Sequence, residues 1–155
     1  MKKLFIVIVL LSLFAIPCLG GEEYLADQGV EPQDFRGIKW GQSAKSVPGL
    51  KELYREEDGS LIIYSRTGDD MLFGAAVLAS VEYIFVDDKL SRIAVVAKGK
   101  PAEDELLKQA FSFYGKESIN VGEDYMWRFA SVSIMFSREP DLGQSVLYYM
   151  YKSKK

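Results

Sequence analysis

The sequence holds few of the side chains on which hydrolytic enzymes usually rely. It contains no histidine, and its one cysteine is Cys18. Nucleophilic catalysis usually pairs serine or cysteine with histidine, and most zinc sites draw on histidine and cysteine. Ser43, Lys45 and Ser46 lie close together, but a serine that caps a short helix explains this group better. We therefore predict a protein that is not an enzyme and has no catalytic, metal-binding or cofactor-binding residues.

Two pairs of adjacent carboxylates could still support acid–base chemistry of the kind that glycoside hydrolases use. These pairs are Asp69-Asp70 and Asp87-Asp88. Both fall in segments with the composition of turns, where aspartate is favoured because its side chain bonds to the local backbone. Neighbouring residues of a strand also point to opposite faces. Turns are therefore the preferred interpretation, and a carboxylate-dependent hydrolase is the alternative.

The aromatic content is the most unusual part of the composition. Nine tyrosines, nine phenylalanines and two tryptophans make up 13% of the chain. A β-rich core accounts for most of them, because aromatic residues favour strands. Tyrosine and tryptophan also suit contact sites, since one end of each side chain is apolar and the other polar. We predict a binding surface of one arginine and four aromatic residues, with Tyr64 and Tyr83 as further members: Arg36, Trp40, Tyr148, Tyr149 and Tyr151.

One segment, at about 101–114, has a clear helical pattern. Pro101 suits the first turn, where its missing N–H costs nothing, and acidic residues follow it at the positive end of the helix dipole. Apolar residues fall on one stripe at helical spacing: Leu106, Leu107, Ala110, Phe111 and Tyr114. Gly115 is a natural stop. A second, short helix is expected at about 43–48, because Ser43 can cap it and Pro48-Gly49 ends it.

Alternating apolar and polar residues predict about seven strands joined mostly by tight turns. An additional short edge strand is expected at 35–41. The main candidates are residues 50–55, 61–66, 79–86, 90–98, 125–130, 132–138 and 145–152. The last of these is apolar or aromatic on both faces, which indicates a central or covered strand. The predicted fold is α+β, an antiparallel sheet with the long and the short helix packed on one face.

Residues 1–20 have the features of a secretory signal peptide. Two lysines precede an apolar run at 4–16 that is too short to span a membrane, and the best cut lies between Gly20 and Gly21. Lipidation at Cys18 is an alternative, disfavoured because Pro17 would obstruct the peptidase. We assign residues 21–33 to a flexible leader and residues 34–155 to a single domain.

Removal of residues 1–20 leaves 135 residues with 17 basic and 22 acidic side chains, a net charge of −5. An acidic chain without a basic cluster is a poor nucleic-acid binder. The predicted mature chain has no cysteine for a disulfide and no transmembrane helix, and we expect it in the periplasm or outside the cell. The leading hypothesis is a non-enzymatic envelope protein that binds another envelope protein, or itself, through its sheet. The alternative is a module that holds a small apolar ligand or a glycan between the long helix and the sheet.

The stretch Phe35–Gly41 reads FRGIKWG and is followed by Ser43 and Val47. It resembles the start of small uncharacterised exported proteins of bacteria, in which such a motif precedes a short helix and β-hairpins. The same region is distantly similar to outer-membrane assembly lipoproteins of the SmpA/BamE type and to β-lactamase-inhibitor-like domains, which pair short helices with an antiparallel sheet. The resemblance implies an exported protein of this fold and implies no activity.

Overall fold

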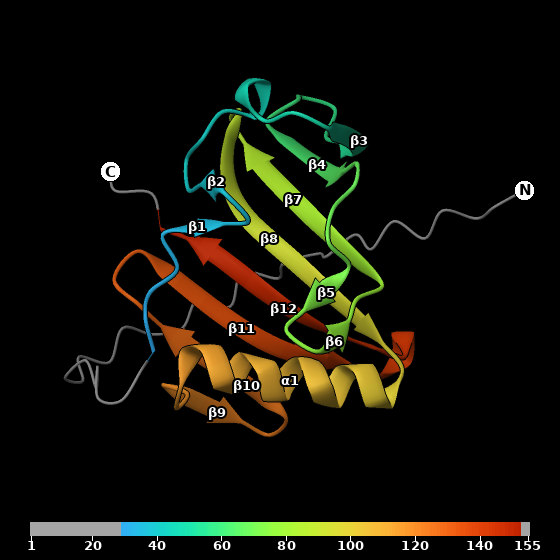
Figure 1. The fold of residues 1–155 in the computed structure, drawn as a ribbon. Helices are drawn as coiled ribbons and strands as arrows, with labels where there is room; N and C mark the ends of the chain where they lie inside the picture. Colours follow the sequence, from blue (N-terminus) through green and yellow to red (C-terminus); the bar gives the residue numbers. More distant parts are fainter. Residues whose placement is uncertain (1–28, 153–155) are drawn as a thin grey trace, which may run out of the picture.

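The alternating segments of the sequence fold into one large antiparallel sheet. A computed structural model describes residues 29–152, and within them an eight-stranded sheet carries a 15-residue helix, α1 (Lys100–Tyr114), across one face (Figure 1). The strands, in their order across the sheet, are β3 (Leu50–Arg55), β4 (Leu61–Arg66), β7 (Ser80–Val86), β8 (Lys89–Lys98), β12 (Gln144–Tyr151), β11 (Val132–Glu139), β10 (Asp124–Arg128) and β9 (Ile119–Val121).

Two small hairpins lie on the same face of the sheet as α1 (Figure 1). They are β1 (Asp34–Phe35) with β2 (Ile38–Lys39), and β5 (Leu72–Phe73) with β6 (Ala76–Val77). Two single turns of 3₁₀ helix complete the described elements: η1 (Ala44–Ser46) and η2 (Pro140–Leu142).

The large sheet consists of two four-stranded meanders that meet at its centre, where β8 pairs with β12. Strands β3, β4, β7 and β8 form one half, and β9 to β12 form the other in reverse order. The turn from β7 to β8 has positive φ angles at both Asp87 and Asp88, 49° and 61°. Positive φ at both central residues is the type I′ geometry that matches the twist of paired strands.

The core lies between the sheet and α1. Leu106, Ala110 and Tyr114 are the buried residues of the helix, which packs against β6, β8 and β12. The largest fully buried side chains of the sheet belong to this core, and the bulkiest are Trp127, Tyr83, Tyr149, Phe85 and Phe136. A smaller apolar cluster lies on the opposite face of the sheet and comprises Ala94, Val96, Val146 and Tyr148.

The structure confirms the predicted α+β class, the antiparallel sheet and the long helix, and it changes two details. The sheet has eight strands rather than about seven, because the short edge strand β9 pairs with β10. The expected second helix at 43–48 is only the 3₁₀ turn η1, since Pro48-Gly49 follows too soon for an α-helix to form. The segment 35–41 forms the β1–β2 hairpin instead of an edge strand, and β12 is central, as its two apolar faces indicate.

Several predictions fall outside the described residues. These are the signal peptide at 1–20, its cleavage between Gly20 and Gly21, the lipidation alternative at Cys18, and the first part of the leader. Within residues 29–152, no helix is both long enough and apolar enough to cross a bilayer.

Candidate functional site

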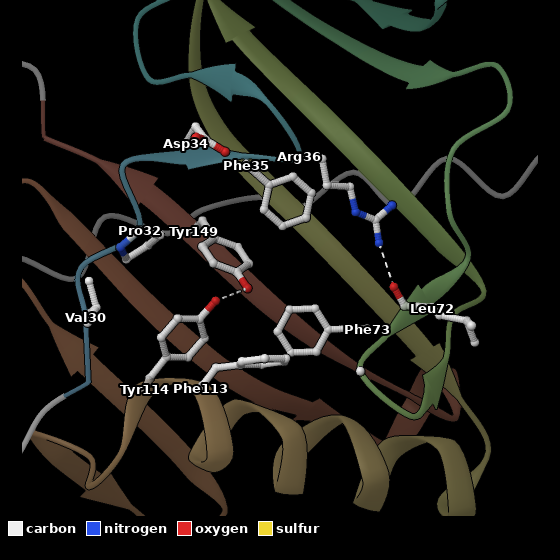
Figure 2. A pocket seen from close by; sticks show the side chains of 11 residues that line it. Val30, Pro32, Asp34, Phe35, Arg36, Leu72, Phe73, Phe113, Tyr114 and Tyr149 are labelled. Atoms are coloured by element: carbon white, nitrogen blue, oxygen red, sulfur yellow. Dashed lines mark hydrogen bonds between the residues drawn. The ribbon is translucent and has the colours of Figure 1, made fainter.

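An aromatic pocket of about 350 Å³ opens between the C-terminal end of α1, the two small hairpins and strand β12 (Figure 2). Apolar and aromatic side chains make up most of its lining, and Asp34, Arg36 and two tyrosine hydroxyls supply the polar groups. The apolar and aromatic members are Val30, Pro32, Phe35, Leu72, Phe73, Phe113, Tyr114 and Tyr149. We call this site the aromatic pocket.

Two tyrosines form the floor of the aromatic pocket. Tyr149 points from β12 toward the helix, and Tyr114 is the last residue of α1, so their hydroxyl oxygens lie 2.7 Å apart. Figure 2 shows the two hydroxyls directed toward each other at the centre of the site. Burial raises the pKa of Tyr114 to about 12 and the pKa of Tyr149 well above its ordinary value. Both side chains are therefore uncharged at neutral pH.

Phenylalanines form the walls. Phe35 packs edge-on against Tyr149 with ring centroids 5.1 Å apart, and Phe73 packs in the same way against Phe113 at 5.1 Å. Such edge-to-face pairs are favourable because the positive edge of one ring meets the negative face of the other. Phe113 is 49% exposed, so this wall also forms part of the mouth of the pocket.

The guanidinium of Arg36 holds the β1–β2 hairpin to the segment before β5. It pairs with the carboxylate of Asp69 at 2.7 Å and donates hydrogen bonds to the carbonyl oxygens of Asp70 and Leu72. The hydroxyl of Tyr83 donates to the same carboxylate at 2.7 Å. This network joins both hairpin segments to β7 and fixes the position of the wall that Leu72 contributes.

The segment 29–33 closes another side of the pocket. The backbone N–H of Gly29 donates to the carbonyl of Tyr114 at 2.8 Å, and the indole N–H of Trp40 donates to the carbonyl of Pro32 at 2.9 Å. These residues belong to the end of the predicted leader, and the two hydrogen bonds attach them to α1 and to the turn after β2.

The FRGIKWG motif, Phe35–Gly41, builds much of this site. Phe35 supplies a wall, and Arg36 and Gly37 form the turn between β1 and β2 with φ angles of 53° and 80°. Trp40 lies over Tyr149 with ring centroids 6.3 Å apart. The motif therefore has a structural role in shaping the aromatic pocket.

The five residues of the predicted binding surface lie on two faces of the sheet. Arg36 and Tyr149 line the aromatic pocket, and Trp40 stacks on Tyr151 beside it, with centroids 6.0 Å apart and planes at 9°. Tyr148 points to the opposite face, where its hydroxyl donates to Glu139 at 3.1 Å. Adjacent residues of a strand alternate between faces, so Tyr148 and Tyr149 belong to different environments.

Tyr64 and Tyr83, the two further members of the predicted surface, both lie on the helix-facing side of the sheet. Tyr64 packs edge-on against Phe85 at 5.5 Å. Tyr83 and Tyr149 are both fully buried in the core, and of the two only Tyr149 also lines the aromatic pocket. The sequence alone does not identify Phe73, Phe113 or Tyr114 as site residues. For Tyr114, the apolar stripe of the predicted helix indicates a buried position facing the sheet.

Both carboxylate pairs make structural contacts. Asp69 accepts from Arg36 and Tyr83, and the side chain of Asp70 accepts from the backbone N–H of Leu72 at 3.0 Å. The hydroxyl of Ser43 donates to Asp88 at 2.6 Å. Across residues 29–152, no three histidine, cysteine, aspartate or glutamate side chains gather closely enough to hold a metal ion.

No family model, curated protein or solved structure matches this chain. The resemblance carried by the FRGIKWG motif therefore stays a prediction, and the site is interpreted from its own geometry.

The tyrosine pair should make the stability of the protein sensitive to alkaline pH. In an unfolded chain a tyrosine loses its proton near pH 10, whereas folded Tyr114 keeps its proton up to a pKa of about 12. The stabilisation from this difference is complete below pH 10 and is lost between pH 10 and 12, because the unfolded state releases its protons first. Urea unfolding across this range should show a falling free energy of unfolding. The Tyr114→Phe/Tyr149→Phe variant should show a smaller fall, and an equal fall would contradict this account.

Proposed function

We propose that this chain is a non-enzymatic binding module that holds a small, mostly apolar ligand in the aromatic pocket. The observation that carries the proposal is the pocket itself, a hollow of about 350 Å³ with aromatic walls and few polar groups. Small-molecule sites in proteins are typically about 300–1,000 Å³ in volume, with mostly apolar linings and a few oriented polar groups. From the amino-terminal sequence we also propose that the module works outside the cytoplasm, in the cell envelope.

The chemistry of the lining favours binding over catalysis. A general acid or base works best when its pKa lies near the operating pH. Tyr114 and Tyr149 keep their protons far above neutral pH, and the charge of Arg36 is matched by Asp69. These three polar side chains of the aromatic pocket are therefore suited to orienting a ligand.

A partner protein is the second candidate occupant. Three side chains around the mouth of the pocket are apolar and exposed, namely Val30 at 85%, Leu72 at 48% and Phe113 at 49%. Exposed apolar residues around a concave site suit the docking of a protein through an inserted side chain. This candidate agrees with the hypothesis of an envelope protein that binds another protein.

Replacing Phe113 with serine tests the proposed site. An uncharged fluorescent probe, N-phenyl-1-naphthylamine, should bind the wild-type chain saturably, and Phe113→Ser should weaken its binding about tenfold. The expected loss follows from removing roughly half of the contact area of a buried ring, about 1.4 kcal/mol. Fluorescence titration measures both affinities.

Leu142→Ser is the matched control for this test. Leu142 is 53% exposed on η2 and does not line the aromatic pocket, so its loss should leave the affinity for the probe unchanged. No saturable binding to the wild-type chain, or equal losses in the two variants, would contradict the proposed site.

A further inference from the structure

The two tyrosine hydroxyls on the floor of the aromatic pocket carry two hydrogens, and the hydrogen bond between them uses only one. Each hydroxyl is the other's one hydrogen-bond partner among the described residues, and the geometry allows either to donate. We assign the hydrogen of this bond to Tyr149, because Tyr149 is fully buried whereas Tyr114 is 8% exposed, so that the spare hydrogen is the one with more access to the pocket. The hydrogen of Tyr114 then has no acceptor within residues 29–152, and an unsatisfied buried donor is costly.

The pKa shifts of the two tyrosines agree with Tyr149 as the donor and Tyr114 as the acceptor. Burial raises the pKa of both tyrosines, and the hydrogen bond raises the pKa of Tyr149 further while lowering that of Tyr114. A hydroxyl that donates holds its proton more tightly, whereas one that accepts loses its proton more easily. Tyr114 is 8% exposed and lines the pocket, and Figure 2 shows its hydroxyl directed toward that of Tyr149 at the centre of the site.

The charges around the aromatic pocket indicate which acceptor suits this donor. Arg36 is paired with Asp69 and bonded to two backbone carbonyls, so its charge is neutralised locally. The carboxylate of Asp34 also lines the pocket, where it accepts from the backbone N–H of Gly37. The negative charge of Asp34 would repel an anionic ligand, whereas a neutral oxygen acceptor would not be repelled in this way.

We propose that the aromatic pocket selects uncharged aromatic ligands that carry an acceptor oxygen, such as aryl ketones, and that the hydroxyl of Tyr114 donates a hydrogen bond to that oxygen. The aromatic walls contact the flat body of the ligand, and the tyrosine pair orients it. This inference rests on the proposed function, since it names the ligand class of the same site.

Three naphthalene probes of similar shape test the ligand class by protein-detected NMR titration. They are 2-acetonaphthone with a neutral acceptor, 2-isopropylnaphthalene with none, and 2-naphthoate with an anionic acceptor. The Tyr114→Phe/Tyr149→Phe variant removes both hydroxyls and keeps both rings, an exchange that costs little stability because no partner is left unpaired. The ratio of ketone affinity to hydrocarbon affinity should fall about fivefold in the variant, as expected for the loss of one hydrogen bond. Affinity for the hydrocarbon should change less than twofold.

Tyr148→Phe, on the opposite face of the sheet, is the control and should leave this ratio unchanged. An unchanged ratio in the double variant, or tightest binding of 2-naphthoate, would overturn the inference while leaving the proposed function in place. If neither the ketone nor the hydrocarbon binds the wild-type chain at the pocket residues, the proposed function itself fails.

Discussion

Replacing Tyr149 with alanine is expected to lower the free energy of unfolding by about 3–5 kcal/mol, the usual cost of deleting a large buried aromatic side chain. Tyr149 is fully buried in the central strand β12, and its ring contacts those of Phe35, Trp40 and Tyr114. The substitution would leave a cavity under the β1–β2 hairpin and remove the hydrogen-bond partner of Tyr114. Urea denaturation followed by circular dichroism measures the loss.

Tyr151→Ala is the matched control for this result. Tyr151 lies on the same strand and the same face, but it is partly exposed and packs at the margin of the core against Trp40. Its loss should therefore cost about 1 kcal/mol, the scale of a single aromatic pair. Equal small losses in the two variants would mean that Tyr149 is a surface contact residue, as the sequence alone suggested.

Strand β12 and helix α1 show how much of the fold local sequence patterns can predict. Alternation along 145–152 was enough to predict a strand with two apolar faces, and spacing along 101–114 was enough to predict the helix. Neither pattern says which face of the strand receives the helix, because that depends on contacts between distant parts of the chain. Alternation alone already places Tyr148 and Tyr149 on opposite faces, which a binding surface containing both does not respect, and the structure adds that Tyr149 is the one facing the helix.

Elements without a strong local pattern were missed. Strand β9 has only three residues, including an asparagine, and it forms because β10 offers it a pairing partner. The β5–β6 hairpin is shorter still, and its strands are only two residues each. Long-range pairing, rather than intrinsic propensity, determines such short strands.

The candidate site depends on the same kind of long-range placement. Asp69 and Asp70 are chemically identical neighbours with the composition of a turn, and the sequence does not distinguish them. The structure does so because Asp69 meets both Arg36 and Tyr83, whereas Asp70 bonds the local backbone. Arg36 and Asp69 are 33 positions apart, so their pairing could not be read from spacing.

The ion pair between Arg36 and Asp69 is expected to be the second large contributor to stability. Asp69→Ala should lower the free energy of unfolding by about 3 kcal/mol, because it leaves a largely buried guanidinium without its counter-charge and the hydroxyl of Tyr83 without an acceptor. Arg36→Ala should cost a similar amount, since it removes the counter-charge of the Asp69 carboxylate and the side-chain donor to the carbonyl of Leu72. Urea denaturation measures both variants.

The Arg36→Ala/Asp69→Ala double variant separates the pair from its surroundings. If the two side chains stabilise the fold through each other, the double variant should lose about 1–3 kcal/mol less than the sum of the single losses. Glu52→Ala is a suitable comparison, because Glu52 forms an exposed ion pair with Arg55 on β3, and exposed pairs contribute little. Strict additivity would show that Arg36 and Asp69 act independently.

The same variants connect stability to the proposed site. Without Arg36 the segment that contains Leu72 and Phe73 loses its attachment to the β1–β2 hairpin, so that wall of the aromatic pocket should become mobile. The affinity for N-phenyl-1-naphthylamine should then fall in Arg36→Ala even at temperatures at which the variant is fully folded, whereas Glu52→Ala should bind the probe as the wild-type chain does. Unchanged affinity in folded Arg36→Ala would mean that the pocket keeps its shape without the ion pair, and that Arg36 contributes to the stability of the fold alone.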